Sequence, residues 1–267
     1  MMEGAYRSVR KDGSVYYRSS INYKSTHVSL GSYATEEEAS QAYQEARSLY
    51  FDEEIGLENF HDHIRVLPVD KIICILNHRD HGMYLKTPIY MQKEYIQYYL
   101  TEHVILKFDA DDLFYYATHK ILRRQGSLYV NDYGCQYRVL SRYGIKNYAV
   151  PGRDYIFVNG DQTDYRSVNL LVLSHYHGVI ALSDLIPVRY ETKIHLNGDF
   201  RIGIFDSEEV AAIAYNKAAD YARDHGFDKE FPQNYVEEVL PAEYASIYTE
   251  ISLPRRFRRK VKEMALT

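Results

Sequence analysis

Tryptophan, long apolar segments and all but two cysteines are missing from this sequence of 267 residues. Apolar stretches such as Ile72–Leu76 and Leu170–Leu173 fall far short of the roughly 20 residues that a membrane-spanning helix needs. Cys74 and Cys135 are too few for a four-thiolate zinc site, so we expect free thiols. These absences exclude helical membrane proteins and disulfide-rich domains, and they predict a soluble globular protein without a membrane partner.

Motifs for export and for common cofactors are also missing. The first ten residues lack the apolar core of a signal peptide. The sequence contains no nucleotide-binding glycine loop, nucleophile elbow or flavin motif. We therefore expect a cytoplasmic, nucleoid-associated protein that uses no cofactor.

Two histidine clusters invite interpretation as metal sites, His61–Asp62–His63 and His78–Arg79–Asp80–His81. Neither cluster contains the two histidines four residues apart on a helix that zinc peptidases use. Clusters of this kind usually lie in surface loops, so no metal ligand is predicted from them.

Tyrosine is abundant, with 28 copies, and the net charge of -5 is unevenly distributed. Residues 4–30 hold five basic side chains and one acidic one, whereas residues 35–54 hold one basic side chain and seven acidic ones. A mildly acidic protein can therefore still present a basic face to an anionic partner. The alternative is a solvated charged face without a partner.

An internal repeat divides the chain. LGSYATEEEASQAYQEA at residues 30–46 aligns without a gap with IGIFDSEEVAAIAYNKA at residues 202–218. Thr35 and Ser207 stand at helix N-cap positions, and alanine and tyrosine then recur at helical spacing. Each copy predicts an amphipathic helix whose small-residue face lies against a sheet.

Strand-like segments separated by turn residues precede each predicted helix. Both copies therefore predict three antiparallel strands plus one helix. The expected strands are Tyr6–Arg10, Val15–Asn22, His27–Leu30, Gly178–Leu182, Val188–Leu196 and Phe200–Ile202, with a turn over Ser183–Pro187 in the second copy.

YRSVR at residues 6–10 and LGSYATEEEASQAY at residues 30–43 resemble the DNA-binding domain of the plant Apetala and ethylene-response-factor family. The resemblance covers residues 4–60 strongly and 178–236 moderately. It implies that the sheet lies in the DNA major groove, with Ile21 facing the helix. Together with the charge pattern it predicts DNA contacts by Arg7, Arg10, Lys11, Arg18, Ser20, Asn22 and Lys24.

The two copies depart from the family pattern in their strands. His27 and Ser29 stand where the family often has arginine and tryptophan. In the second copy Glu191 lies among the candidate contacts, either to accept from a cytosine amino group or as a solvated side chain. The other candidates there are Arg189, Lys193, His195 and Arg201.

Residues 102–177 resemble the HNH family of phage homing nucleases, which commonly carry an Apetala-type domain. The matching segments are VILKFDADD at residues 104–112, NGD at residues 159–161 and RSVNL at residues 166–170. The resemblance implies a strand, a short acidic helix, two strands, a crossover loop, a strand, a polar turn and a terminal helix, which is a ββα-type core.

The catalytic residues of that family are missing. A histidine must activate water there, while an acidic neighbour and a later His or Asn hold a divalent cation. The family places an Asp-His pair where this chain has Ile156 and Phe157, which bind neither a proton nor a hard cation. Asn169 and His175 remain, and we expect Asn169 to hold the loop by backbone hydrogen bonds. The sequence thus predicts a degenerate core that is not an enzyme.

Two other hypotheses stay open. The first is a metal-dependent nuclease or nickase with a relocated site that uses Asp154, Asp161, Asp164 or His175. The second is an interaction module that presents tyrosine-rich surfaces to protein partners.

Basic residues outside the two sheets extend the predicted DNA contacts. Residues 107–153 hold eight basic side chains and four acidic ones, and Arg138, Arg142 and Lys146, close to Tyr148, suit backbone and groove contacts. PRRFRRKVKE at residues 254–263 predicts an arm on DNA phosphates, with a disordered solubilising tail or a nuclear import signal as alternatives. Its candidate contacts are Arg255, Arg256, Arg258 and Arg259.

The sequence therefore predicts an α+β protein in which two Apetala-type domains, residues 4–60 and 178–240, flank a degenerate HNH core at residues 102–177. Residues 61–101 are expected to form a linker with short helices, one of them over Glu94–Leu100, and residues 241–267 a basic segment. The expected function is sequence-specific binding of double-stranded DNA by a transcriptional repressor. A homo-oligomer or a protein co-regulator is the further partner we expect.

Overall fold

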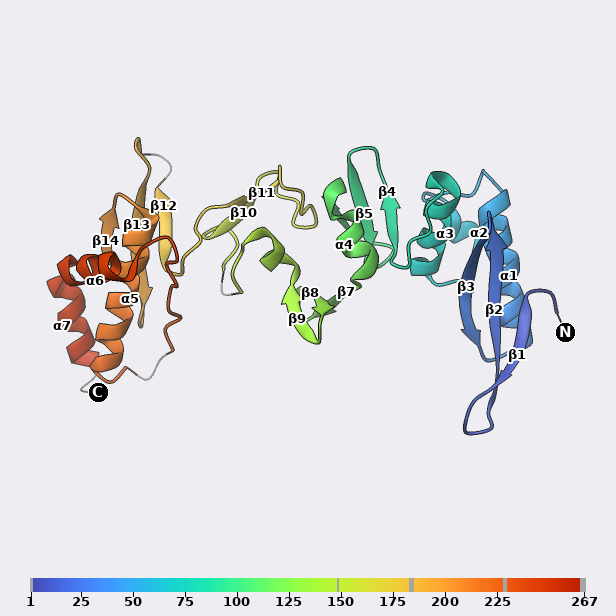
Figure 1. Ribbon diagram of the computed structural model, residues 1–267, viewed down its shortest axis with the longest axis horizontal. Coiled ribbons are helices and arrows are strands. Elements are labelled where there is room, and N and C mark those ends of the chain that lie inside the picture. Colours follow the sequence, from blue (N-terminus) through green and yellow to red (C-terminus); the bar gives the residue numbers. More distant parts are fainter. Residues whose placement is uncertain (1, 148, 183–184, 228–229, 265–267) are drawn as a thin grey trace. The chain divides into compact units, whose positions relative to one another are not determined.

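The computed structural model describes residues 2–147, 149–182, 185–227 and 230–264. These residues form four three-stranded antiparallel sheets, one two-stranded sheet and seven α-helices (Figure 1). The α+β class predicted from the sequence is confirmed. None of the helices in this part of the chain is both long and apolar enough to cross a lipid bilayer.

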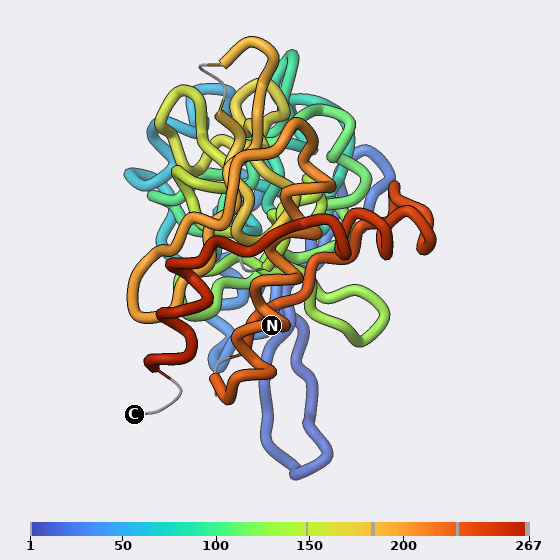
Figure 2. The backbone as a smooth tube through the Cα atoms, turned by 90° about the vertical axis from the view of Figure 1, so that its left-hand side faces the viewer, coloured from blue at the N-terminus to red at the C-terminus, as the bar shows by residue number. Residues whose placement is uncertain are grey.

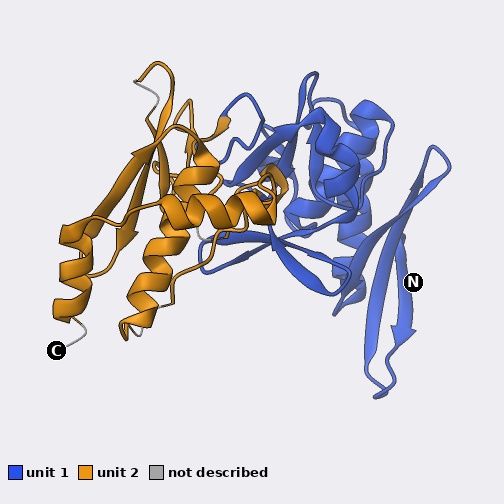
Figure 3. Ribbon diagram, turned by 60° about the vertical axis from the view of Figure 1, so that its left-hand side comes forward, with its two compact units in different colours: residues 1–139, 161–169 blue, residues 140–160, 170–267 orange. Residues whose placement is uncertain are grey.

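The chain divides into two compact units (Figure 3). Unit 1 comprises residues 1–139 and 161–169, and unit 2 comprises residues 140–160 and 170–267. The boundary falls inside the segment that resembles a nuclease core. The chain enters unit 2, returns to unit 1 for Asp161–Asn169 and then goes back to unit 2.

Unit 1 begins with a three-stranded sheet and the helix that covers it. The third strand pairs with β2 only from Tyr17 onward, so the end of the β1–β2 hairpin projects as a two-stranded ribbon (Figure 2). Thr35 Oγ1 accepts from the N–H of Glu38 (3.1 Å) and the Glu38 carboxylate accepts from the N–H of Thr35 (3.4 Å), which confirms the predicted N-cap. The elements are β1 Ala5–Val9, β2 Val15–Tyr23, β3 Thr26–Tyr33 and α1 Glu36–Phe51.

The predicted linker over residues 61–101 is instead part of the core of unit 1. Helix α2 (Phe60–His63) is followed by α3 (Val69–His81), and α3 buries four aliphatic side chains in the same core as Ile21 and Leu30 of the sheet. The IICIL stretch explains this, since apolar residues all round a helix are stable only when the helix is buried. The four side chains are Ile72, Ile73, Ile75 and Leu76.

Two polar side chains tie α1 to the α2–α3 segment. The Glu45 carboxylate is buried and accepts from the backbone N–H groups of residues 65, 66 and 67 at 2.9–3.1 Å. Arg79 Nη1 donates to the carbonyls of Leu49 (2.9 Å) and Ile55 (2.7 Å), at the C-terminal end of α1. These hydrogen bonds provide partners for backbone N–H and C=O groups that would otherwise lack one at the end of α1 and in the loop before α3.

The helix predicted over Glu94–Leu100 is wrong, because Tyr95–Tyr99 is strand β5. Tyrosine-rich segments favour strands, and Ile96 and Tyr98 both lie on the buried side. β5 is the middle strand of a sheet with β4 (Ile89–Met91) and β6 (Ile105–Asp109).

The rest of unit 1 is a short helical segment and a small sheet. The 3₁₀ helix η1 (Ala110–Asp112) continues into α4, as the acidic DADD segment predicted. The elements that follow are α4 Leu113–Thr118, β7 Ile121–Arg124, β8 Ser127–Asp132 and β9 Cys135–Arg138.

Unit 2 begins within the 3₁₀ helix η2 (Val139–Tyr143) and continues with the two-stranded sheet of β10 (Tyr155–Phe157) and β11 (Leu170–Val172). The terminal helix expected for a ββα core is wrong: the residues after Asn169 form β11, and no helix follows before β12 in the described residues. Leu170–Val172 is too short and too apolar to begin a surface helix, and it pairs with β10 instead.

The second repeat copy completes unit 2. Its predicted strands and helix are confirmed, and the Ser207 hydroxyl accepts from the N–H of Val210 (3.2 Å) as the N-cap. Within the expected turn, Ser183 and Asp184 lie outside the described residues. The elements are β12 Val179–Leu182, β13 Arg189–His195, β14 Asp199–Phe205, α5 Glu208–Asp224, α6 Pro241–Glu250 and α7 Arg255–Met264.

The two copies share packing details that the sequence alignment did not single out. Gly4 (φ +74) and Gly178 (φ +73) each lie so close to a helix tyrosine that a Cβ atom would be 2.1 Å from a ring carbon of Tyr43 and 2.3 Å from one of Tyr215. The pairing of each middle strand with the third strand also shifts by one residue, after Ser19 and after Thr192, so that Leu30 and Ile202 are the extra residues. These common features support a duplication.

Replacing Gly4 or Gly178 by alanine is expected to lower the free energy of unfolding by about 2–4 kcal/mol, because the Cβ atom meets the tyrosine ring at a positive φ. Gly13 is the matched control, since its φ is +85 but no atom lies within 4 Å of an added Cβ atom. Gly13→Ala should cost only about 1 kcal/mol. Chemical denaturation of the three variants measures the difference, and equal losses would contradict the close packing.

Candidate nucleic-acid interface

The outer face of the β1–β3 sheet presents small polar side chains around one arginine. Strand alternation turns Arg18, Ser20 and Asn22 away from the helix, whereas Ser19 and Ile21 are buried, as predicted for Ile21. Residues that pair across neighbouring strands lie on the same face of the sheet, so Ser29 lies beside Ser20 on the outer face. Three more pairs lie on this face. These pairs are Tyr6 with Arg18, Arg18 with Ser32 and Asn22 with His27.

Several cations of the β1–β3 sheet and its turns form no ion pair in the described part of the chain. Arg10 lies over the ring of Tyr16 (5.2 Å) and Lys24 over the ring of Tyr23 (5.1 Å). Five basic side chains form no ion pair with any residue that the structure describes, so their charge is available to an external anion. They are Arg7, Arg10, Lys11, Arg18 and Lys24.

Arg7 does not share the face of Arg18. It pairs with Tyr17, and Tyr17 pairs with Tyr33, so the strand register puts Arg7 on the helix-side face of the sheet. Arg7 is nevertheless exposed. Cations therefore lie on both faces of the β1–β3 sheet.

The outer face of the second sheet carries the predicted residues but neutralises them. Arg189, Glu191, Lys193 and His195 alternate along β13, and Arg201 pairs with Lys193 across the sheet. The buried Glu191 lies between two of these cations. The ion pairs are Lys193 with Glu191 (2.7 Å), Arg201 with Glu191 (3.7 Å), His195 with Asp199 (2.7 Å) and Arg189 with Asp206 (2.8 Å).

Sequence reasoning put Glu191 among the cations of this strand but missed Asp199 and Asp206 as their partners. The row Tyr6–Arg18–Ser32 of the first sheet corresponds to Ile180–Glu191–Ile204 in the second, so an arginine is replaced by a glutamate between two aliphatic side chains. The change of charge at the middle position, from Arg18 to Glu191, could have been predicted from the alternating pattern of the strand. The partners Asp199 and Asp206 could not, because their positions depend on how the turns fold.

The basic C-terminal segment is a helix that is packed onto unit 2. Phe257 and Val261 of α7 are buried in the core that α5 and β13 form, so the alternative of a disordered tail is wrong over residues 255–264. Residues 265–267 lie outside the described part. Arg255, Arg256 and Arg258 have no ion-pair partner in the described residues, whereas Arg259 pairs with Glu263 (3.5 Å).

The nuclease-like loop Asp161–Asn169 is held in a fixed arrangement within unit 1. Asn169 Nδ2 donates to the carbonyl of Asp164 (2.8 Å), as expected from the sequence. Lys107 pairs with Asp161 (3.1 Å), while Arg166 forms two bonds with the buried Asp164 (2.8 and 2.6 Å). Hydrogen bonds from Thr163, together with Lys107, lower the pKa of Asp161. The loop carboxylates thus serve the fold.

The remaining nuclease-like positions lie in unit 2 and are also engaged. Ile156 and Phe157 pair with the two leucines of β11. His175 Nδ1 lies 3.1 Å from Glu208 of α5, and Asp154 is buried against Arg153 (2.8 Å). Within the described residues, no three His, Cys, Asp or Glu side chains gather as metal ligands would.

The three basic candidates of the middle segment are not brought together by one unit. Arg138 lies in unit 1, on β9 beside Tyr129, and its Nη2 donates to Ser127 Oγ (3.5 Å). Arg142 and Lys146 lie in unit 2 and are exposed. Tyr148 lies outside the described residues.

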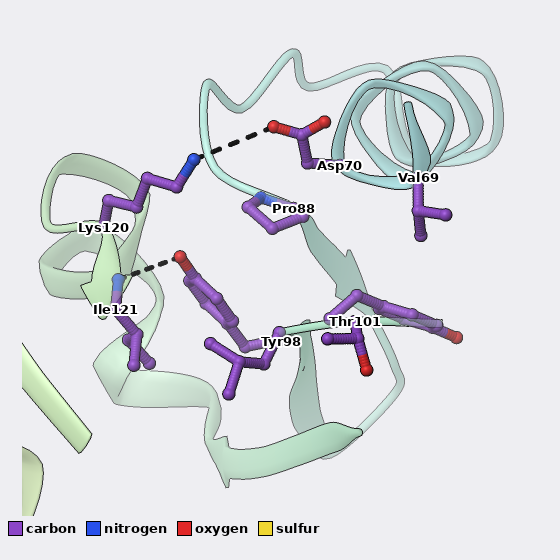
Figure 4. A pocket seen from close by; sticks show the side chains of 9 residues that line it. Val69, Asp70, Pro88, Tyr98, Thr101, Lys120 and Ile121 are labelled. Carbon is purple, nitrogen blue, oxygen red and sulfur yellow. Dashed lines mark hydrogen bonds and ion pairs between the residues drawn. The ribbon is translucent and has the colours of Figure 1, made fainter. Parts of the chain in front are cut away.

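A cavity of about 210 Å³ in unit 1 offers no catalytic arrangement (Figure 4). The two charged side chains at its edge, Asp70 and Lys120, pair with each other (3.8 Å). Tyr98 Oη accepts from the N–H of Ile121 (3.0 Å), and burial raises the pKa of Tyr98 to about 12.

Comparison of the chain with protein-family models, curated proteins and solved structures gives no match.

Proposed function

We propose that this chain binds double-stranded DNA with sequence specificity through the outer face of the β1–β3 sheet. The observation that carries the proposal is the set of five basic side chains that form no ion pair in the described residues, on the same sheet as the small polar groups. A major groove admits a two-stranded ribbon, and side chains such as Ser20 and Asn22 can read base edges while arginines hold phosphates. An Apetala-type sheet is the interpretation that fits this arrangement.

Helix α7 supplies a second phosphate contact in this proposal. Its first turn holds Arg255 and Arg256, where the helix dipole is already positive, so a bound anion stabilises it. The buried Phe257 and Val261 fix the helix to the core. An anchored basic helix loses less conformational entropy on binding than a free arm would.

Binding without cleavage suits a transcriptional regulator, and repression is the simplest mode. Phe157 stands where the HNH resemblance requires a histidine base, and the four carboxylate or imidazole groups that could replace it are engaged. The proposal is therefore an HNH-derived protein whose central segment keeps its fold and has lost its chemistry.

Selection of bound duplexes from a random 40-base-pair pool by the full chain tests the proposal. We expect an enriched sequence motif and a binding constant that falls steeply with salt, by a slope of about 0.9 for each phosphate contact. Failure to enrich any motif, with binding that does not respond to salt, would reject DNA recognition.

The second candidate is a metal-dependent nickase, which the pairing of Asp161 and His175 with neighbouring charged side chains disfavours. Supercoiled plasmid incubated with the chain and Mg²⁺ or Mn²⁺ is expected to stay intact, because loss of one general base costs at least about 100-fold in rate. Nicking that EDTA stops and that His175→Ala abolishes would establish a relocated site. His195→Ala is the matched control, since this histidine also pairs with a carboxylate but lies on the second sheet.

A further inference from the structure

Tyr133 occupies the tip of the β8–β9 hairpin in an unusual conformation. Its side chain is 100% exposed and its φ is +46, followed by Gly134 with φ +82. The flanking residues Asp132 and Cys135 pair directly, so the turn consists of these two residues alone. Two-residue turns with positive φ at both positions favour asparagine, aspartate or glycine at the first, and a bulky aromatic residue there is strained.

The Tyr133 side chain does not stabilise the fold through any contact that the structure describes. The ring makes no hydrogen bond, ring contact or ion pair with any residue that the structure describes. A strained backbone position and a fully hydrated aromatic ring both disfavour the folded state. Because Tyr133 lowers the stability of the folded state and makes no such contact within the described residues, we expect its ring to contact a partner outside the chain.

The surrounding sheet indicates the chemistry of that contact. Residues 119–138 carry four basic side chains and one acidic one; Lys120 pairs with Asp70, and the three arginines of the β7–β9 sheet still exceed its one acidic side chain. Tyr137 of the same hairpin is also exposed, by 49%. Exposed aromatic rings on a basic support are typical of surfaces that stack on nucleobases while cations hold the backbone.

We propose that the Tyr133 ring stacks on a nucleobase of the bound DNA, at a base step that the protein opens. This rests on the proposed DNA binding and adds a contact that none of the basic candidates provides. Aromatic and apolar wedges enter base steps in proteins that bend DNA, so the tip of this hairpin is a site of local unstacking.

Tyr133→Asn separates a role in folding from a role in binding. Asparagine suits the positive φ, so the variant should be more stable than the parent chain, while its affinity for the selected duplex should fall about 10-fold because the stacking ring is gone. Tyr133→Phe keeps the ring and should keep the affinity. Gln125→Asn is the matched control, because Gln125 (φ +47) and Gly126 (φ +79) form the equivalent turn between β7 and β8.

The measurements are thermal unfolding, fluorescence anisotropy of the selected duplex, and the fluorescence of 2-aminopurine placed in turn at each position of that duplex. Support requires that Tyr133→Asn alone loses affinity and that one 2-aminopurine position changes its signal only with the parent chain and Tyr133→Phe. Unchanged affinity in Tyr133→Asn would overturn stacking and assign the ring to a protein partner. If the parent chain binds no duplex, the proposed function itself fails.

Discussion

Replacing Arg7, Arg10 and Arg18 together by alanine is expected to weaken binding to the selected duplex by at least about 100-fold, since each good arginine contact contributes about 1–3 kcal/mol. The three side chains form no ion pair within the described residues, so the change removes positive charge from both faces of the β1–β3 sheet without leaving a buried carboxylate behind. The slope of the binding constant against salt should flatten by about 0.9 for each phosphate that the variant no longer neutralises. Anisotropy titrations at several salt concentrations measure both quantities.

The matched control is the same number of changes on the second sheet. Arg189, Lys193 and Arg201 are equally basic, but each already forms an ion pair, the first with Asp206 and the other two with the shared Glu191. Their triple alanine variant should lose less than about 10-fold in affinity, since a cation that already has an acidic partner attracts phosphate only weakly. Equal losses for the two triple variants would show that both sheets contact DNA and would contradict the assignment of DNA binding to the first sheet.

Glu45→Ala should be the most damaging single change to unit 1. The carboxylate accepts from three successive backbone N–H groups, and alanine leaves these donors without their acceptor; the N–H of Leu67 is buried, whereas those of Arg65 and Val66 are partly accessible to water. An unsatisfied buried donor costs about 1–3 kcal/mol and the two accessible donors cost less, so we expect a loss of about 3–4 kcal/mol. Chemical denaturation followed by circular dichroism measures it.

Two further substitutions test the reason for this loss. Glu45→Gln retains the size of the side chain but turns an NH₂ group toward N–H donors, so it should recover only part of the stability. Glu37→Ala removes an exposed carboxylate from the first turn of the same helix and should change stability by about 0.5 kcal/mol or less. A loss in Glu37→Ala as large as that in Glu45→Ala would mean that helix charge, rather than the backbone bonds, explains the effect.

Local patterns predicted the two repeat copies well. Thr35, Ser207 and the alternation around Ile21 determine caps and faces within a few residues, and the structure confirms all three. The linker prediction failed for a non-local reason: α3 is stable because it is buried against α1, and Glu45 makes its bonds to residues about 20 positions away. A single sequence does not reveal which segments will meet.

The candidate site shows the same limit. Alternation along β13 correctly gathered Arg189, Lys193 and His195 on one face, but their net charge depended on acids in the adjoining turn and strand. The strand β11 took the place of a helix because pairing with β10 outweighed the weak local signal. Tyr133 was hidden among 28 tyrosines, and only its backbone angle and full exposure distinguish it.

The return of Asp161–Asn169 to unit 1 means that the polypeptide passes from one unit to the other three times. A protease cut after Val139 would therefore not release unit 1 as an intact fragment. The downstream fragment would still supply the loop, which is bound to β6 by the N–H of Lys107 donating to Thr163 (2.9 Å) and the N–H of Tyr165 donating to Lys107 (2.8 Å). The two fragments would therefore stay associated through this loop, and cleavage of the backbone after Val139 would not by itself separate them.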